Sequence, residues 1–345
     1  MRARLREVLE SDPRMEVVGE ASNGQQAIAM CEEVRPDVIT MDMVLPVMNG
    51  LAATEYVMAN RPTPILIVSS SSNRGELFST YDALAAGAVD VIEKPRPEIP
   101  DEEWARDFLS AVALVSRIRV ITHPRGRLQS IRRPDPAPPA PLPSRGVRSP
   151  AGGYEVVAIG ASTGGPAAIG EVLRGLSGDF SLPIILVLHI GASHGDSFVK
   201  WLDGQSSRSV RFGEEGEALS DAAGQVLMAP PDYHLEVRDG LVRLTDAPER
   251  HSCRPSVDVL FESVAAEYGT RALACLLTGM GRDGASGLHL VRERGGVTIA
   301  QDEQTCVLYG MPLAAVQLGA VEHILPLDQI GPALSKLATR NEVRG

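Results

Sequence analysis

Ala158-Ile-Gly-Ala-Ser-Thr-Gly-Gly-Pro166 joins an apolar segment to a predicted helix through a turn of small residues. The apolar run Val156–Ile159 is typical of a buried strand, and the residues from Pro166 to Leu176 are predicted to form a helix. Ser162 lies between two glycines, at the spacing of a nucleophile elbow, where a serine occupies the sharp turn between strand and helix. The alternative is an ordinary glycine-rich turn of an α/β fold. A dinucleotide-binding loop is less favoured, because Ser162 replaces the second glycine of G-x-G-x-x-G.

The composition indicates a globular protein of two domains. The chain has 345 residues, of which 44% are hydrophobic and 22% are charged. Its net charge of −11 argues against a nucleic-acid binder and against binding to anionic membranes. The four cysteines are scattered, and their spacing indicates neither a disulfide framework nor a zinc site. Without a signal peptide or an apolar run of about 20 residues, we expect a cytoplasmic protein that does not insert into a membrane.

A proline-rich and arginine-rich segment divides the chain. Residues 122–153 carry eight prolines and six arginines with few hydrophobic residues, so they are predicted to form a semi-extended linker. This linker separates a first domain, residues 1–121, from a second domain, residues 154–345. A charged helix, Glu102–Val115, is predicted just before the linker.

The first domain alternates strand and helix patterns. Four short segments are predicted as strands: Glu16–Gly19, Val38–Met41, Ile65–Val68 and Val89–Ile92. A helix is predicted over Gly24–Arg35. The last three strands are followed by Asp42, Ser69 and Lys94 in turn. Because open α/β sheets place their sites at the carboxyl ends of parallel strands, these polar residues mark a candidate site.

The second domain repeats this arrangement with three residues that suit hydrolysis. The predicted strands Val156–Ile159, Ile184–Leu188 and Arg271–Leu277 lead to Ser162, His189 and Asp283. A serine needs a histidine to take its proton, and the histidine needs a carboxylate to orient its ring. The chain order Ser, His, Asp differs from the order Ser, Asp, His of the α/β-hydrolases, so that fold is not predicted.

Other histidines and aspartates compete for the two supporting roles. The competing residues are His194, His234, His251, Asp196, Asp258 and Asp302. His189 is preferred because a buried strand directs it to the same sheet edge as Ser162, and Asp283 because a glycine-rich turn surrounds it. Asp258 is interpreted as structural, since it falls within a predicted helix, Ser256–Tyr268, for which Ser256 is a candidate N-cap. Asp239-Gly240 predicts a hairpin turn.

Several motifs occur together in the order of one family. They are Ile159-Gly-Ala-Ser-Thr-Gly-Gly-Pro166, His189, Ala229-Pro230, Arg254-Pro-Ser-Val-Asp-Val-Leu-Phe261 and Leu277-Thr-Gly-Met-Gly-Arg-Asp-Gly284. With them the chain resembles the chemotaxis protein-glutamate methylesterases, the CheB family, over nearly its whole length. The resemblance implies a receiver (flavodoxin-like) domain, a linker and a doubly wound, mostly parallel α/β esterase domain. It also implies hydrolysis of glutamate γ-methyl esters on chemotaxis receptors, deamidation of receptor glutamine, and no cofactor for catalysis.

The resemblance assigns roles to single residues of the second domain. Ser162 is implied as nucleophile, His189 as base and Asp283 as its partner. Thr163 matches a position linked to histidine orientation, and Met280 matches one linked to the oxyanion hole through its backbone N–H. The sequence departs from the family after His189, where it has Ile-Gly-Ala instead of Met-Pro, which bears on the shape of that loop.

In the first domain Asp42 matches the phosphorylated aspartate of receivers, Ser69 the switch hydroxyl and Lys94 the phosphate-binding lysine. A receiver normally opens with a strand that ends in two acidic residues, which help to hold Mg²⁺. This sequence starts inside what resembles the first helix, so that strand and both acids are expected to be absent. Asp42 is then the remaining candidate Mg²⁺ ligand. A misassigned start codon is the preferred explanation, and a degenerate receiver is the alternative.

The resemblance implies methyl-accepting chemotaxis receptors and a histidine kinase phosphodonor as partners. Two further functions compete with a receiver-regulated esterase. The first is a non-catalytic signalling module that binds partners through a degenerate receiver, and the second is an acyl hydrolase for small molecules. Release of methanol from methylated receptor separates the three.

Overall fold

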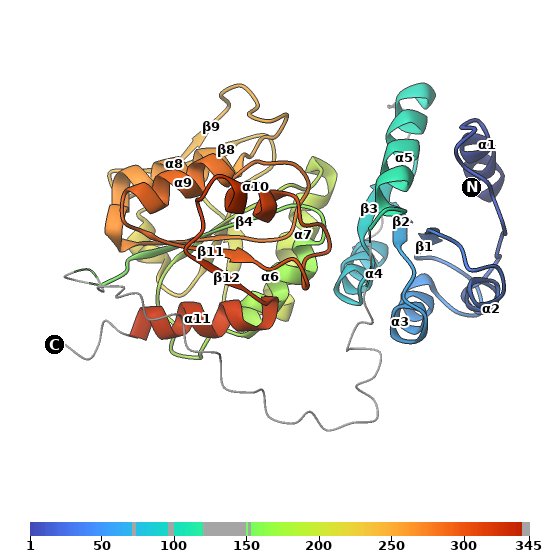
Figure 1. Cartoon of the computed structure of the whole chain (residues 1–345), viewed down its shortest axis with the longest axis horizontal. Helices are drawn as coiled ribbons and strands as arrows, with labels where there is room; N and C mark the ends of the chain where they lie inside the picture. The colour runs from blue at the N-terminus through green and yellow to red at the C-terminus, as the bar shows by residue number, and fades with distance from the viewer. Residues whose placement is uncertain (71–73, 96–99, 119, 121–149, 151–152, 340–345) are drawn as a thin grey trace. The chain divides into compact units, whose positions relative to one another are not determined.

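The chain is described here by a computed structural model that covers residues 1–70, 74–95, 100–118, 120, 150 and 153–339 (Figure 1). It divides into two compact units, residues 1–134 and 135–345. Nearly all of the predicted linker, 122–153, lies outside the described residues, so its structure stays a prediction.

The first unit is a parallel sheet with helices. Its elements in chain order are α1 (Arg2–Glu10), α2 (Gly24–Val34), β1 (Ile39–Asp42), α3 (Gly50–Asn60), β2 (Ile65–Ser69), α4 (Arg74–Ala85), β3 (Asp90–Glu93) and α5 (Asp101–Val115). The strands are hydrogen-bonded in the order β1–β2–β3. The apolar central strand β2 is buried along its whole length, as a strand covered on both faces requires.

Helix α5 shows why this segment folds as it does. Its buried residues are Trp104, Phe108, Val112 and Val115, which recur at helical spacing and form one apolar stripe. The stripe contacts β2 and β3. Three acidic residues in the first turn of α5 face the positive end of the helix dipole, and the helix predicted at Glu102–Val115 is confirmed.

The strand predicted at Glu16–Gly19 is wrong. Residues 15–21 have no regular secondary structure. A strand needs a backbone ladder to a neighbour, and β1 is the outermost strand on its side of the sheet within the described residues. The described sheet therefore has three strands, and the expected absence of the first receiver strand stays a prediction.

The second unit is built on one parallel sheet of seven strands. The strands are β4 (Val156–Ala161), β5 (Ile184–Leu188), β6 (Val210–Phe212), β7 (Val226–Met228), β10 (Ala272–Leu276), β11 (Val297–Gln301) and β12 (His323–Leu325). Their order in the sheet is β12–β11–β10–β4–β5–β7–β6. All six neighbouring pairs are parallel. This agrees with the predicted doubly wound α/β domain.

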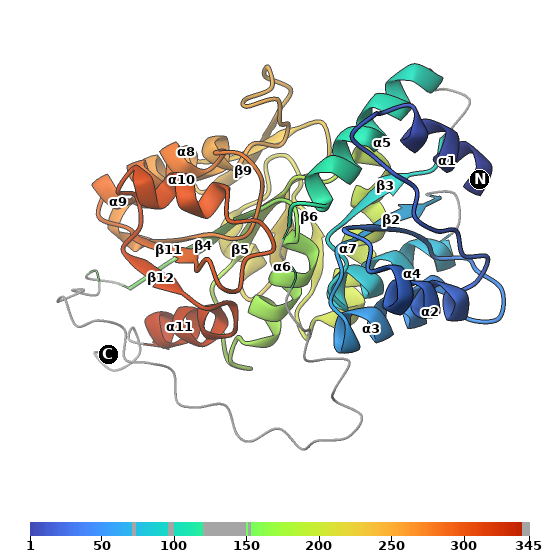
Figure 2. The ribbon, with the colours of Figure 1, turned by 45° about the vertical axis from the view of Figure 1, so that its right-hand side comes forward.

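Helices cover both faces of this sheet. They are α6 (Gly165–Arg174), α7 (Ala192–Gln205), α8 (Val257–Tyr268), α9 (Ala285–Glu293), α10 (Met311–Gln317) and α11 (Leu327–Thr339). In Figures 1 and 2, α6 and α11 lie together on one face, and α8, α9 and α10 lie on the other. The chain runs from β4 to β5 in one direction and later returns to place β10 on the opposite side of β4. The strand order therefore reverses at β4, which is where open α/β sheets form their binding crevice.

A two-stranded hairpin, β8 (His234–Arg238) and β9 (Leu241–Thr245), extends from this unit. Asp239 and Gly240 join the strands, and both have positive φ, 55° and 70°. Two positive φ values are the mark of a type I′ turn, so the hairpin predicted from Asp-Gly is confirmed.

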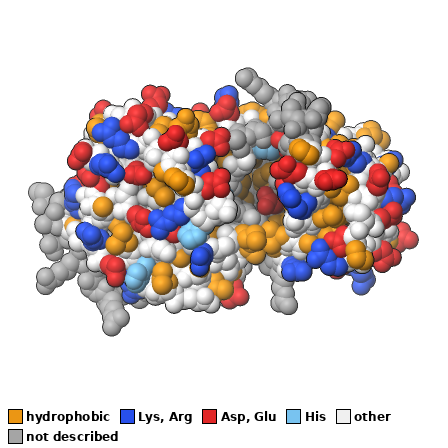
Figure 3. Space-filling model, turned by 90° about the horizontal axis from the view of Figure 1, so that it is seen from above, with side chains coloured by type: hydrophobic (Ala, Val, Ile, Leu, Met, Phe, Trp, Pro, Cys, Tyr) orange, Lys and Arg blue, Asp and Glu red, His pale blue; other side chains and the backbone are white. Residues whose placement is uncertain are grey.

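The surface carries charges of both signs. Acidic and basic side chains are interspersed on the face drawn in Figure 3. Among the described residues, the helices are all too short or too polar to cross a membrane.

Candidate active site

Adjacent strand ends bring Ser162, His189 and Asp283 to one edge of the large sheet. Ser162 follows the last residue of β4, and His189 follows the last residue of β5. The two strands are paired up to these ends, and the His189 N–H donates to the Ala161 carbonyl at 3.0 Å. Asp283 lies in the loop that joins β10, on the other side of β4, to α9. The three predicted residues therefore lie at the same sheet edge, where the strand order reverses, and a hydrogen bond joins His189 to Asp283.

The Ser162 turn is held by backbone contacts and by glycines. The Ser162 N–H donates to the Thr278 carbonyl at 3.0 Å, and the Ser162 carbonyl accepts from the N–H of Gly165 at 2.7 Å. Gly164, which precedes α6, has a φ of 77°, a conformation that favours glycine. A Cβ on Gly279 would stand 2.7 Å from the Cβ of Ser162, so only a glycine allows the β10 loop to approach this closely.

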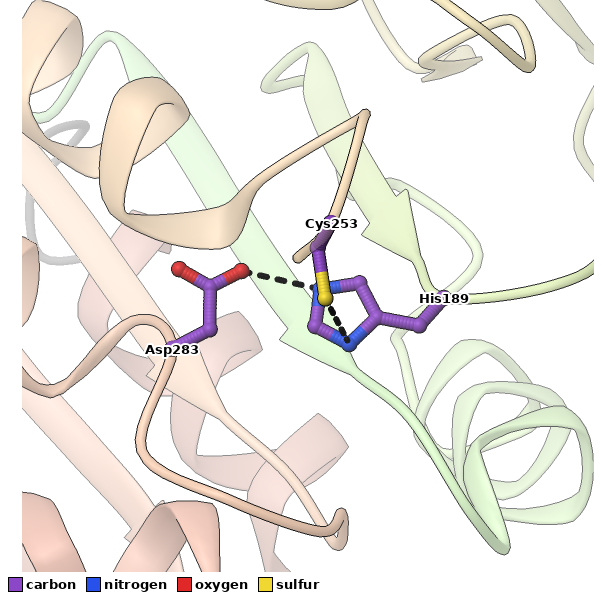
Figure 4. A group of neighbouring side chains, drawn as sticks. All are labelled: His189, Cys253 and Asp283. Atoms are coloured by element: carbon purple, nitrogen blue, oxygen red, sulfur yellow. Dashed lines mark hydrogen bonds and ion pairs between the residues drawn. The ribbon is translucent and has the colours of Figure 1, made fainter. Parts of the chain in front are cut away.

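His189 contacts Asp283 through one ring nitrogen. The distance from His189 Nε2 to Asp283 Oδ2 is 2.9 Å (Figure 4). The Asp283 side chain is almost completely buried, with 3% exposed. Its carboxylate accepts four further hydrogen bonds, from the N–H groups of Val257 (2.7 Å), Asp258 (3.0 Å) and Gly284 (3.0 Å) and from the hydroxyl of Ser256 (2.7 Å). Each oxygen therefore has at least two partners, and the carboxylate is fixed in place.

Two of these donors are the first backbone N–H groups of α8, so Asp283 caps that helix. Burial raises the pKa of Asp283, but its hydrogen bonds with His189, Asp258 and Ser256 outweigh burial and lower the pKa. Ser256 does occupy the predicted N-cap position, yet its side chain donates to Asp283 instead of capping the helix itself. Ser256 is therefore the N-cap residue of α8, as predicted, while the Asp283 carboxylate accepts the hydrogen bonds from the first N–H groups of that helix.

Nδ1, the second ring nitrogen of His189, is the one that could transfer a proton. Because Nε2 contacts Asp283, only Nδ1 is available to accept a proton from a nucleophile. Across the described part of the chain, no hydrogen bond joins Ser162 Oγ to His189. The Sγ of Cys253 lies 3.7 Å from Nδ1. Burial lowers the pKa of His189, but the interactions with Asp283 and Cys253 outweigh it and raise the pKa to about 9.

Four of the competing residues, His234, His251, Asp258 and Asp302, have other partners. Asp258 is fully buried, and its carboxylate contacts His251 Nε2 at 3.0 Å and accepts from the Gly287 N–H at 2.7 Å. His234 Nδ1 accepts from the Ser256 N–H at 3.1 Å. Asp302 accepts from Thr305. Asp258 thus supports the start of α8 and α9, as the structural interpretation predicted.

Thr163 and Met280 both lie next to the triad in the chain. Thr163 is buried, and its carbonyl accepts from the Thr278 hydroxyl at 3.0 Å. Met280 is 55% exposed, in the loop that leads to Asp283. Their assignment to histidine orientation and to the oxyanion hole stays a prediction.

The first unit holds a second polar cluster at the ends of β1, β2 and β3. Lys94 Nζ lies 2.9 Å from Asp42 Oδ1 and 3.0 Å from Glu76 Oε1. Glu76 Oε1 also accepts from the N–H of Ser70 at 2.9 Å and is 3.4 Å from the Ser69 hydroxyl. The predicted trio of Asp42, Ser69 and Lys94 therefore comes together, with Glu76 as a fourth member that sequence reasoning missed.

The described residues around Asp42 do not form a Mg²⁺ site by themselves. Mg²⁺ prefers an octahedral shell of oxygens. Asp42 Oδ1 already accepts from Lys94 and from the Val44 N–H, and Glu76 Oε1 is held by Lys94 and Ser70. The groups of metal-ligating side chains found among the described residues surround Asp283 instead.

Comparison with known families decides the classification. The family model of the CheB methylesterases matches residues 157–334. The chain belongs to the CheB methylesterase family. The family of response regulator receiver domains matches residues 1–100, so the first unit of this CheB chain is a receiver.

Relatives of known name cover the chain almost completely. A protein of Anaeromyxobacter dehalogenans is 42% identical over 96% of this chain and 92% of its own length. One of Nitrosospira multiformis is 41% identical over 98% of this chain and 94% of its own. Both are named protein-glutamate methylesterase/protein-glutamine glutaminase.

A solved structure supports the fold of the second unit. The CheB methylesterase catalytic domain of Thermotoga maritima is 34% identical, with a TM-score of 0.51. It covers 53% of this chain, and 98% of that domain is matched. The predicted combination of a receiver with an α/β esterase domain is therefore confirmed.

Proposed function

We propose that this chain hydrolyses γ-methyl esters of glutamate on chemotaxis receptors and deamidates receptor glutamine, with Ser162, His189 and Asp283 as its catalytic residues. One observation supports the proposal most. Asp283 contacts Nε2 of His189, which leaves Nδ1 available to accept a proton. His189 directly follows β5, and this strand pairs with β4, which leads directly to Ser162. The named relatives carry the same two activities in their names.

The first half of the reaction forms an acyl-enzyme. Nδ1 of His189 takes the proton of the Ser162 hydroxyl while Oγ attacks the ester carbonyl, and the negative charge moves to the carbonyl oxygen. The start of α6, directly after the serine turn, presents N–H groups near this charge. The protonated His189 then donates to the departing methoxy group, which leaves as methanol. Asp283 stabilises the imidazolium meanwhile.

The second half regenerates the enzyme. Water gives a proton to Nδ1 and attacks the acyl carbon, after which His189 returns the proton to Ser162 Oγ as the glutamate carboxylate leaves. A glutamine side chain follows the same path, with ammonia leaving in place of methanol. No cofactor takes part in either half.

Regulation is assigned to the receiver unit. Asp42, at the end of β1 beside Lys94, is proposed to accept a phosphoryl group from a histidine kinase, with Ser69 as the switch hydroxyl. The receiver family match supports this role. We place the enzyme in the cytoplasm, where the signalling helices of chemotaxis receptors and the kinase would meet it.

The direct test compares Ser162→Ala with the parent enzyme on methylated receptor. Methanol release is expected to fall by at least about 10⁴-fold, because a triad member acts as part of a unit. Ser207→Ala is the matched control, since Ser207 is an exposed serine remote in sequence from all three residues. If Ser162→Ala stays within tenfold of the parent while folded, the serine is not the nucleophile.

A parent enzyme that releases methanol from a small acyl ester but not from methylated receptor would instead support the small-molecule hydrolase. An enzyme that releases methanol from neither substrate would support the non-catalytic signalling module.

A further inference from the structure

The Cys253 side chain lies beside the nitrogen that the proposed reaction uses. Its Sγ is 3.7 Å from Nδ1 of His189, and Asp283 contacts the opposite nitrogen (Figure 4). Cys253 is partly exposed and forms no disulfide, and its thiol donates to the His251 carbonyl at 3.4 Å. No step of the proposed ester hydrolysis uses this thiol, so the hydrolysis does not explain why the thiol lies beside His189.

The turn that carries Cys253 is firmly built. The backbones of Arg250 and Cys253 exchange two hydrogen bonds, of 3.1 and 3.0 Å. Between them, His251 and Ser252 have φ values of 54° and 59°, so the turn has the positive φ pair of a tight hairpin turn. Arg250 donates twice to the carboxylate of Glu262 on α8, which anchors the turn to that helix. The thiol is therefore held near His189 by the fold.

The distance between the two atoms suits a shared metal ion. Zinc binds thiolate sulfur at about 2.3 Å and imidazole nitrogen at about 2.0–2.1 Å. At a tetrahedral angle these bonds place sulfur and nitrogen roughly 3.5 Å apart. Figure 4 draws Sγ over the face of the imidazole ring and not in its plane, so the Cys253 side chain must rotate before its sulfur and the Nδ1 lone pair can bind the same ion.

Asp283 completes the arrangement from the other side of the ring. A metal-bound histidine usually donates its second N–H to a carboxylate, which fixes the ring and strengthens the ligand. Asp283 does this at 2.9 Å from Nε2. Its oxygens already accept hydrogen bonds from α8 and from Gly284, so Asp283 is better placed to orient the ring than to bind the ion itself.

We propose that His189 Nδ1 and Cys253 Sγ bind a thiophilic divalent cation of the zinc class, which inhibits the esterase reversibly. Water completes the coordination shell. On binding, the metal–nitrogen and metal–sulfur bonds form, and the protons carried by Nδ1 and Sγ leave to solvent without any change of oxidation state. The inhibition follows because the metal occupies the lone pair that would take the Ser162 proton. This consequence rests on the proposed function, whereas metal binding does not.

Cobalt serves as the spectroscopic probe. Full-length reduced protein is titrated with Co²⁺, and binding is followed by the thiolate-to-cobalt charge-transfer band in the near ultraviolet. We expect the band to saturate at one cobalt per chain and to disappear on addition of Zn²⁺. It should be absent from Cys253→Ser and His189→Gln and retained in Cys306→Ser, which removes another partly buried cysteine. An unchanged band in Cys253→Ser, or no band in the parent, would overturn the proposal.

Inhibition is measured separately by methanol release. The Zn²⁺ concentration that halves the activity should rise at least about tenfold in Cys253→Ser, as expected for the loss of a ligand, and a chelator should restore the parent activity. Equal inhibition of the parent and Cys253→Ser, or an active enzyme that retains full rate with cobalt bound, would refute the inhibitory site. If the protein shows the thiolate-to-cobalt band but has no esterase activity, the metal site would be supported and the proposed function would be refuted.

Discussion

His189 is the residue on which the proposed chemistry depends. Its two nitrogens have different partners, Asp283 at Nε2 and Cys253 near Nδ1. The pKa of about 9 means that most of the imidazole is protonated at neutral pH, whereas a general base must be neutral. His189 must therefore lose a proton before it can act as the base.

This difference predicts a pH profile. Methanol release at low substrate concentration should rise with pH and level off near pH 9, because the raised pKa keeps His189 protonated below it. Cys253→Ser should move this limb to lower pH, since Cys253 contributes to the raised pKa. The same profile in both enzymes would show that the thiol does not influence the base. Cys306→Ser is the matched control and should leave the limb in place.

Two elements, the β4–α6 turn and the β10–α9 loop, have to fit together for Ser162 to stand at the site. Gly279 belongs to the β10–α9 loop where that loop passes Ser162, and a Cβ there would come within 2.7 Å of Ser162 Cβ and 2.3 Å of Met311 Sδ. The flexible methionine can move, but Ser162 belongs to a turn that is fixed by its own backbone hydrogen bonds. A larger residue at position 279 would therefore displace Ser162.

Gly279→Ala is expected to lower kcat by tens to hundreds of fold and to cost about 1–3 kcal/mol of folding stability, a cost typical of overpacking. Steady-state methanol release and urea unfolding measure the two effects. Gly178→Ala is the control, because a Cβ at Gly178 meets no atom within 4 Å. A Gly279→Ala enzyme with unchanged kcat would contradict the tight fit described here.

Some elements of the fold and the site could be predicted from the sequence, and others could not. The strand ends that carry Ser162, His189 and Asp283 follow from apolar runs that stop at polar residues, and the sequence shows those runs directly. Cys253 escaped notice because it is 64 residues from His189 in the chain and reaches it only through a turn with two positive φ values. Glu76 was missed for a similar reason, since helix α4 directs it back to the end of β2. The strand predicted at Glu16–Gly19 was wrong because strand formation depends on a neighbour that a local pattern cannot reveal.

At the scale of the whole molecule, a receiver is joined to an esterase, and control requires that phosphorylation of Asp42 changes esterase activity. Glu76 is expected to oppose phosphorylation of Asp42, because its carboxylate accepts hydrogen bonds from Lys94 and from the Ser70 N–H beside Asp42. A phosphoryl group on Asp42 would compete with this buried carboxylate for the same donors and would be repelled by its charge.

Glu76→Gln should therefore raise the rate at which Asp42 is phosphorylated by acetyl phosphate, by about tenfold for a gain of roughly 1.4 kcal/mol. Gel separation of phosphorylated chains gives the rate, and methanol release shows whether activation follows. Asp42→Asn, alone and combined with Glu76→Gln, should abolish the phosphorylated chain on the gel. It should also abolish any rise in methanol release caused by acetyl phosphate. A slower reaction in Glu76→Gln would show that Glu76 assists phosphorylation instead of opposing it.

The central claim, that Ser162 and not the neighbouring Cys253 attacks the ester, is tested most directly by trapping the acyl-enzyme. The enzyme is mixed with a peptide that contains glutamate γ-methyl ester, quenched in acid within milliseconds, digested and mapped by mass spectrometry. We expect an added γ-glutamyl acyl group on the peptide that contains Ser162, with the Cys253 peptide unmodified. An acyl group on Cys253, with none on Ser162, would contradict the central claim.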